Sequence, residues 1–173
     1  MHPYERDPRD DAPVSFGAIL GGVVIIATVF GALFVLVAIM VTSAEASPRR
    51  LAYIEKVQGL HEVKNRKTIQ AMVGVNPART PWCGYMVAAV VKKTGGKPPS
   101  GYPRALAWKS FGRAVSLSNA HKGDIVVFRT KRGYHVSIYS HRFKGRVCAV
   151  GGNQSNRIKL TCYRASTVKW VRR

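Results

Sequence analysis

The chain has 173 residues, of which 28 are lysine or arginine and eight are aspartate or glutamate, so its formal charge at pH 7 is +20. The bases gather in the segment 47–173, which holds 26 of them and only three acids, Glu55, Glu62 and Asp124, for a formal charge of +23. Such a segment attracts polyanions, the candidates being teichoic acid, lipopolysaccharide, anionic lipid and nucleic acid. The scarcity of carboxylates argues against a glycosidase, which ordinarily needs two at the scissile bond, and a muramidase would depend almost entirely on Glu62.

A short polar tail, residues 1–13, precedes a long apolar segment. Residues 14–41 contain no charged side chain over 28 positions. As an α-helix at about 1.5 Å per residue they would exceed a hydrocarbon core of roughly 30 Å, whereas the apolar part of a signal peptide has only about 7–15 residues. We therefore expect a transmembrane helix at 14–42 and a linker at 43–50, although 44–46 (AEA) also has the form of a signal cleavage site.

The segment 80–87 (TPWCGYMV) predicts a loop that becomes a helix with a thiol in its first turn. Thr80 suits the N-cap and Pro81 the first helical position, and the glycines at 95–96 end the helix. Cys83 would then lie among unpaired N–H groups at the positive end of the helix dipole. That position favours the thiolate and can hold an oxyanion, although a helical cysteine is more often a small core residue.

A base for this thiol is predicted on a β-hairpin further along the chain. Residues 123–128 (GDIVVF) and 133–140 (GYHVSIYS) are two strand-like runs joined by a turn. His135 opens the second strand, a fixed position that suits a general base. The other histidines fall in the tail, a loop or turns: His2, His61, His121 and His141.

A third residue can orient this histidine. The predicted strand 146–150 leads into 151–156 (GGNQSN), where Asn153 can pair with the far nitrogen of His135 and fix its tautomer. Alternatively, Asn153 serves only the turn after the two glycines, because asparagine suits turn geometry.

Three short helices are expected before these strands, beginning at residue 47 and covering 65–73 and 103–111. Helices followed by antiparallel strands predict an α+β fold, and residues 51–173 are long enough for one hydrophobic core.

In their order, these segments resemble the CHAP amidohydrolase/peptidases, papain-like cell-wall hydrolases frequent in bacteriophage lysins. The similarity runs from residue 51 to the C-terminus. It rests on Pro-Trp-Cys opening a helix, Gly-Asp-Ile-Val-Val-Phe, a strand-borne histidine and Gly-Gly-Asn-Gln-Ser-Asn. It implies a papain-like domain with Cys83 as nucleophile, His135 as general base and acid, and Asn153 as the orienting residue. Many members carry Glu or Asp near this third position, where this chain has Asn.

The expected substrate-binding residues are Trp82, Trp108 and Gln154, the two tryptophans being core or cleft-wall aromatics otherwise. Cys148 and Cys162 are equally spaced about the intervening turn and can face one another. We expect two buried free thiols, with a disulfide as the alternative after export. No metal or other cofactor is implied, because no His/Cys cluster has ligand spacing.

The leading hypothesis is a membrane-anchored peptidoglycan hydrolase that cuts an amide bond by thiol catalysis, as an endopeptidase or N-acetylmuramoyl-L-alanine amidase, in phage lysis or wall penetration. Its expected partners are peptidoglycan, the membrane, and anionic wall polymers or virion components, and nucleic acid is not expected. The alternative is a non-catalytic basic membrane protein that binds DNA or anionic lipid, for which the charge alone suffices.

The expected location is a single-pass membrane protein whose catalytic domain acts on the periplasmic or wall side, or in a virion membrane. The bases that follow the apolar segment oppose this orientation, because the positive-inside rule keeps such a flank in the cytoplasm. Export against the rule, later release of the anchor and a virion membrane are the three alternatives.

Overall fold

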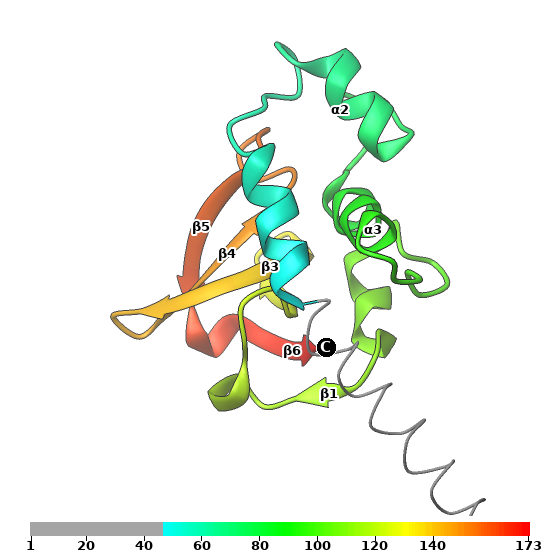
Figure 1. Ribbon diagram of the computed structural model, residues 1–173. Coiled ribbons are helices and arrows are strands. Elements are labelled where there is room, and N and C mark those ends of the chain that lie inside the picture. The colour runs from blue at the N-terminus through cyan, green and yellow to red at the C-terminus, as the bar shows by residue number, and fades with distance from the viewer. Residues whose placement is uncertain (1–46) are drawn as a thin grey trace, which may run out of the picture. The chain divides into compact units, whose positions relative to one another are not determined.

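A six-stranded antiparallel sheet dominates the residues that the computed structural model describes, 47–173 (Figure 1). Its strand order is β1-β6-β2-β3-β4-β5. The strands are β1 (Ala114–Val115), β2 (Ile125–Thr130), β3 (Gly133–Phe143), β4 (Arg146–Gly151), β5 (Lys159–Arg164) and β6 (Val168–Arg172). Strands β2 to β5 pair in chain order, and β6 returns to the free edge of β2.

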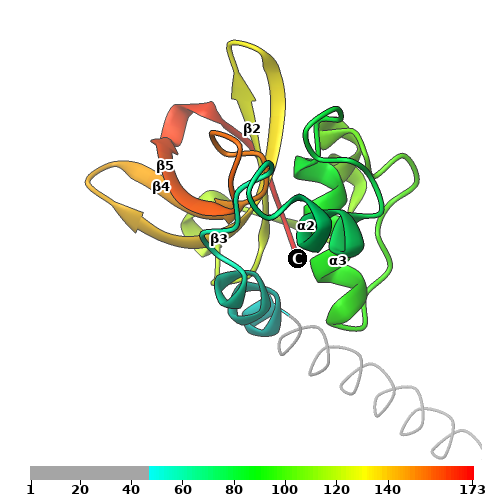
Figure 2. The same ribbon diagram turned by 90° about the horizontal axis from the view of Figure 1, so that it is seen from above.

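The α-helices lie to one side of this sheet (Figures 1 and 2). The described residues open with a helix at 47–56, and α2 (Arg66–Val73) and α3 (Cys83–Lys93) follow it. The remaining helical turns are of the 3₁₀ type: η2 (Ala105–Ser110), η3 (Leu117–Asn119) and η4 (Ala165–Thr167). The helix predicted after Cys83 is confirmed, whereas the segment predicted as a helix at 103–111 forms the tighter η2.

The strands bury apolar side chains on both faces. Ile125 and Val127 of β2 belong to the core that includes Met86 of α3, whereas Val126 and Phe128 belong to a second core on the opposite face. Side chains of a strand alternate between faces, so the uninterrupted apolar run of β2 supplies both cores. The sheet is curved, as Figure 2 shows.

The structure corrects the fold expected from the sequence. An α+β, papain-like domain of short N-terminal helices on an antiparallel sheet, preceded by one transmembrane helix, was expected, and this prediction is wrong. The described residues form a sheet-rich unit with a few short helices, in which β1, β5 and β6 join the three predicted strands. The sequences of β5 (KLTCYR) and β6 (VKWVR) mix basic and apolar residues. They lack the apolar runs that reveal β2 and β4, and pairing with those strands orders them.

No helix among residues 47–173 is long and apolar enough to cross a membrane. The tail at 1–13, the transmembrane helix predicted at 14–42 and the first part of the linker lie outside the described residues. The single-pass membrane location is therefore corrected as well. Within the described part the most apolar helix, α3, has 11 residues, and its apolar side chains belong to the core.

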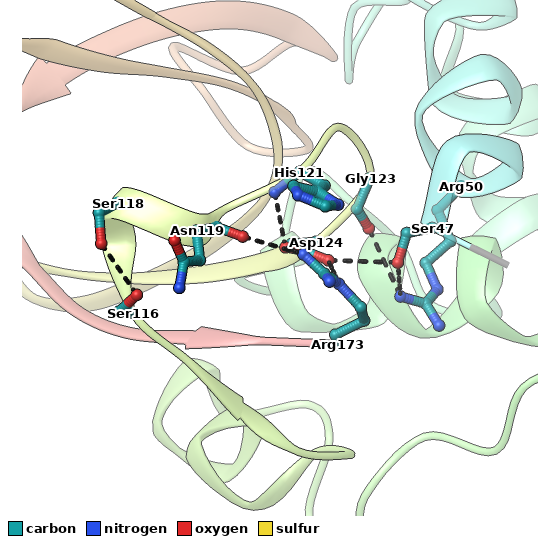
Figure 3. Close-up of polar contacts among 9 residues, drawn as sticks. All are labelled: Ser47, Arg50, Ser116, Ser118, Asn119, His121, Gly123, Asp124 and Arg173. Carbon is teal, nitrogen blue, oxygen red and sulfur yellow. Dashed lines mark hydrogen bonds and ion pairs between the residues drawn. The ribbon is translucent and has the colours of Figure 1, made fainter. Parts of the chain in front are cut away.

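A partly buried ion pair joins the end of the chain to the start of β2 (Figure 3). Arg173 donates to both carboxylate oxygens of Asp124, at 2.8 and 2.7 Å. Asp124 is fully buried and also accepts hydrogen bonds from the Ser47 hydroxyl and the His121 backbone N–H. Removing one partner of such a pair leaves an uncompensated buried charge. Asp124 therefore has a structural role.

Arg50 extends this cluster into the first described helix (Figure 3). Its Nη1 donates to Ser47 Oγ at 3.3 Å and to the Gly123 carbonyl at 3.5 Å, and its guanidinium lies over the Phe111 ring. Burial lowers the pKa of Arg50, and the Asp124 charge opposes this shift.

The structure also corrects the expectation of two free thiols on β4 and β5. Cys148 and Cys162 are directly opposed in the register of these strands and form a disulfide. Among the described residues, Cys83 alone is a free cysteine.

Candidate active site

Cys83 lies where two cavities meet. The first has a volume of about 660 Å³ and is lined mainly by polar side chains of the sheet and its loops, including His135 and Asn153; we call it the polar cavity. The second has a volume of about 430 Å³ and lies against the segment 103–106; we call it the apolar cavity. Pro81, Cys83 and Tyr134 line both. The sulfur therefore stands between two compartments, as a nucleophile must if it attacks a bond in the middle of a substrate.

The helix α3 begins at Cys83 itself, two residues later than the proposed first helical position at Pro81. The thiol is buried, with 8% of the residue exposed. Burial raises the pKa of Cys83, and backbone hydrogen bonds from Val136, Gly84 and Cys83 oppose the shift. The helix terminus was expected to favour the thiolate. Desolvation outweighs that effect here, so the resting group is a thiol.

The backbone of β3 lies directly against this sulfur. The hydrogen bond from Val136 joins the first part of β3 to the first turn of α3. His135 precedes Val136, pairs with Phe128 across the β2–β3 hairpin and lines the polar cavity with Cys83. The structure thus brings the predicted nucleophile and the predicted base to one cavity.

Burial lowers the pKa of His135 to about 4, and hydrogen bonding to the Gln154 side chain opposes this shift. The imidazole is therefore neutral at physiological pH. Its Nε2 shares a 2.9 Å hydrogen bond with Ser137 Oγ. When the Ser137 hydroxyl donates its single proton to Gln154 Oε1, at 3.4 Å, it accepts a hydrogen bond from an Nε2–H group of His135. This tautomer leaves Nδ1 unprotonated and able to accept a proton.

Gln154 is the centre of the network that sets this tautomer. It is buried, with 4% of the residue exposed. Its amide nitrogen donates to the backbone carbonyls of Ala149, Gly151 and Lys159. Its oxygen must then face the other way, where it accepts hydrogen bonds from Tyr163 Oη at 2.6 Å and from Ser137.

Asn153 lines the polar cavity but does not take part in this network. Its backbone is left-handed, with φ 59°, and its side chain makes no hydrogen bond to any other described residue. This conformation fits the alternative prediction, in which Asn153 serves only the turn after the two glycines. Gln154, the residue after Asn153, takes part in the hydrogen-bond network around His135 instead. Gln154 was expected to bind substrate.

Tyr163 is a site residue that the sequence did not indicate. Its ring stacks on Phe128 with centroids 4.2 Å apart and lies 5.9 Å from the His135 ring. Burial, together with the charge that Cys83 can carry, raises the pKa of Tyr163 to about 12. The phenol therefore keeps its proton and donates to Gln154. Strand β5 has no motif that would mark this residue.

Two glycines make this arrangement possible. A Cβ at Gly152 would lie 2.4 Å from the Trp82 ring, and one at Gly151 would lie 2.4 Å from Ser137 Oγ. The chain after β4 can pass between Trp82 and Ser137 only without these side chains. The glycine pair therefore positions Gln154.

The two tryptophans predicted to bind substrate are core residues. Trp82 and Trp108 are fully buried, and neither lines the polar or the apolar cavity. Trp82 Nε1 donates to Glu62 Oε2 at 3.1 Å, and Trp108 Nε1 donates to the Tyr102 carbonyl at 2.9 Å. Their rings are inaccessible to a substrate because the core already covers them.

No carboxylate of the described residues lines either cavity. Glu62 is engaged by Trp82, Asp124 is buried beneath Arg173, and Glu55 is exposed on the first helix. The muramidase alternative therefore has no carboxylate in the cleft. Within residues 47–173 no three His, Cys, Asp or Glu side chains are grouped closely enough to hold a metal ion.

No family model matches this sequence, and no curated protein matches it. The structure is similar to the solved structure of Rv1477, described as a hypothetical invasion protein of Mycobacterium tuberculosis. The TM-score is 0.51 at 17% sequence identity, over 77% of this chain and 64% of the other. The chain thus spans less than two thirds of this neighbour, and at such low identity the similarity concerns the fold alone.

Proposed function

We propose that this domain hydrolyses an amide bond in the peptide part of peptidoglycan, with Cys83 as nucleophile and His135 as general base and acid. One observation carries the proposal. A free cysteine in the first turn of a helix shares a cavity with a histidine whose unprotonated nitrogen is set by a buried hydrogen-bond network. The resemblance of the cysteine, histidine and Gly-Gly-Asn-Gln segments to the CHAP hydrolases adds the substrate class.

The first half of the reaction forms a thioester. Because thiol and imidazole are both neutral at rest, the proton moves from Sγ of Cys83 to Nδ1 of His135 as the sulfur bonds to the carbonyl carbon. Backbone N–H groups at the start of α3 stabilise the negative charge on the substrate oxygen. His135 then protonates the nitrogen of the breaking C–N bond, and the amine leaves.

The second half releases the acid. Neutral His135 takes a proton from water, and the resulting hydroxide attacks the thioester carbon. The C–S bond breaks, the carboxylic acid product departs, and the proton on His135 returns to the sulfur. The network of Ser137, Gln154 and Tyr163 holds the imidazole in one orientation throughout, so these three are positioning residues.

The charge of the described segment suits an anionic wall. A formal charge of +23 attracts teichoic acid or similar anionic polymers through long-range electrostatic attraction. A disulfide is also typical of proteins that work outside the reducing cytosol. The same charge favours a second candidate, a non-catalytic protein that binds nucleic acid. That candidate gives no role to Cys83 and His135, which line the same cavity.

Product analysis tests the reaction class. Purified peptidoglycan incubated with the full chain should gain free amino groups and no new reducing sugar ends. His135→Gln should abolish amine release, whereas His141→Gln should retain it, because exposed His141 lies outside both cavities. Reducing ends that appear in step with lysis would transfer the activity to a glycosidase.

A further inference from the structure

Each of the two cavities that meet at Cys83 contains one arginine. Arg132, in the turn between β2 and β3, lines the polar cavity, and Arg104, immediately before η2, lines the apolar cavity. Both are exposed, and neither forms an ion pair within the described residues. The two arginines therefore lie in different cavities, and Cys83, the proposed nucleophile, lines both cavities.

No carboxylate within residues 47–173 compensates these charges. Neither cavity is lined by a carboxylate of the described residues, and the acids Glu62 and Asp124 are engaged elsewhere. Tyr134, which lines both cavities, carries the Arg129 guanidinium over its ring at 4.8 Å and so adds positive charge. An arginine without a partner in a binding cleft is suited to a carboxylate, which its planar guanidinium can bind through two parallel hydrogen bonds.

The backbone around each arginine is fixed. The turn that carries Arg132 is closed by a hydrogen bond from Thr130 Oγ1 to the Gly133 carbonyl at 3.1 Å. The Arg104 N–H donates to the Gly101 carbonyl at 3.0 Å, and its guanidinium lies close above Gly101, where a Cβ would be 3.4 Å from it. Each guanidinium is thus attached to an ordered turn beside the cleft.

We propose that the substrate of the Cys83 site is an acidic peptide that carries a carboxylate on each side of the scissile amide. Arg132 binds the carboxylate in the polar cavity, and Arg104 binds the carboxylate in the apolar cavity. This inference rests on the proposed amide hydrolysis at Cys83. It adds to it a substrate class, because a peptide whose carboxylates are amidated would lack both ion pairs.

The test compares two forms of one substrate. Peptidoglycan fragments released by a muramidase are used either untreated or after carbodiimide and ammonia have converted their carboxylates to primary amides. For the full chain, amidation should lower kcat/KM for amine release by at least tenfold. Arg132→Gln and Arg104→Gln should each lower kcat/KM roughly tenfold on untreated fragments, mainly through KM, and change little on amidated ones.

Arg142→Gln is the matched control, because Arg142 is an exposed arginine of β3 outside both cavities. It removes the same charge and should leave both substrates unaffected. Equal losses for the two substrate forms, or a loss as large in Arg142→Gln, would overturn the two-carboxylate inference while leaving amide hydrolysis intact.

Binding to Cys83→Ala protein supplies a readout that does not depend on catalysis. Untreated fragments should bind this variant at least about tenfold more tightly than amidated fragments. Arg104→Gln or Arg132→Gln in the same background should remove most of that preference. Absence of any Cys83-dependent cleavage by the wild-type chain would overturn the proposed function and this inference together.

Discussion

The chemistry proposed for this site depends on how burial shifts the pKa values of two side chains, Cys83 and His135. The Cys83 pKa is raised and the His135 pKa is lowered to about 4, so both groups are uncharged near neutral pH. A thiolate–imidazolium pair is therefore not the resting state. The base is ready to accept a proton over an unusually wide range of acidic pH.

This shift predicts the pH dependence of the reaction. In the proposed mechanism the free protein needs unprotonated His135, so kcat/KM should fall in acid only as pH approaches about 4 rather than at the ordinary histidine value of 6.5. The measurement is a pH–rate profile of amine release on a soluble fragment. An acidic limb centred near 6.5 would contradict the burial of His135.

The same shift predicts a pH-dependent stability. Between pH 6.5 and 4 the unfolded histidine binds a proton that the folded one does not, so stability rises with pH across this window and falls as pH drops. Wild-type protein should lose about 2 kcal/mol more than His135→Gln between pH 7 and 5. Urea unfolding at both pH values measures the difference, and parallel losses in the two proteins would refute the assignment.

The sequence singles out the proposed nucleophile and the proposed base because each carries a local signal. Cys83 follows a loop that opens a helix, and His135 lies in an alternating strand next to an apolar one. The positioning residues have no such signal. Gln154 and Asn153 are adjacent, and only the folded turn decides which faces the histidine.

At the scale of elements, the disulfide joins the two strands that end at the site. Cys148 of β4 and Cys162 of β5 are 14 residues apart in the chain, and Tyr163 follows Cys162 directly. Neither cysteine lines the polar or the apolar cavity. We therefore expect the bond to contribute stability and to take no part in the proposed reaction.

Replacing both cysteines by alanine should lower the free energy of unfolding by about 3 kcal/mol, the typical effect of opening a loop of this length. Amine release at a temperature where the variant stays folded should persist. The measurements are urea unfolding and activity on one preparation. Loss of activity in a demonstrably folded variant would show that the disulfide acts on the site.

The elements were predictable where the hydrophobic pattern is strong. The buried run of β2 and the alternation of β3 predict the hairpin that carries His135, and the helix after Cys83 follows from its apolar spacing. Strands β5 and β6 each carry an exposed basic residue, Arg164 and Lys169, and gain order from their neighbours. The sheet-rich character of the domain was missed for this reason.

At the scale of the whole molecule, the formal charge of +23 on residues 47–173 should govern attachment to the wall. Binding to intact walls should weaken steeply as salt rises above physiological strength, because the Debye length falls from about 8 Å to about 3 Å at 1 M. Turnover of a small soluble fragment should change much less. Co-sedimentation and kinetics over one salt series measure both, and salt-independent attachment would remove this role from the charge.

In the proposed reaction Cys83 forms the bond to the substrate carbonyl. The most direct measurement is the rate of amine release from purified peptidoglycan by the wild-type chain and by Cys83→Ala, with circular dichroism to show that both are folded. The thiol is the only protein group that bonds to the substrate in the proposed mechanism, so the variant should release no amines above the rate without protein. Amine release by folded Cys83→Ala at the wild-type rate would contradict the mechanism outright.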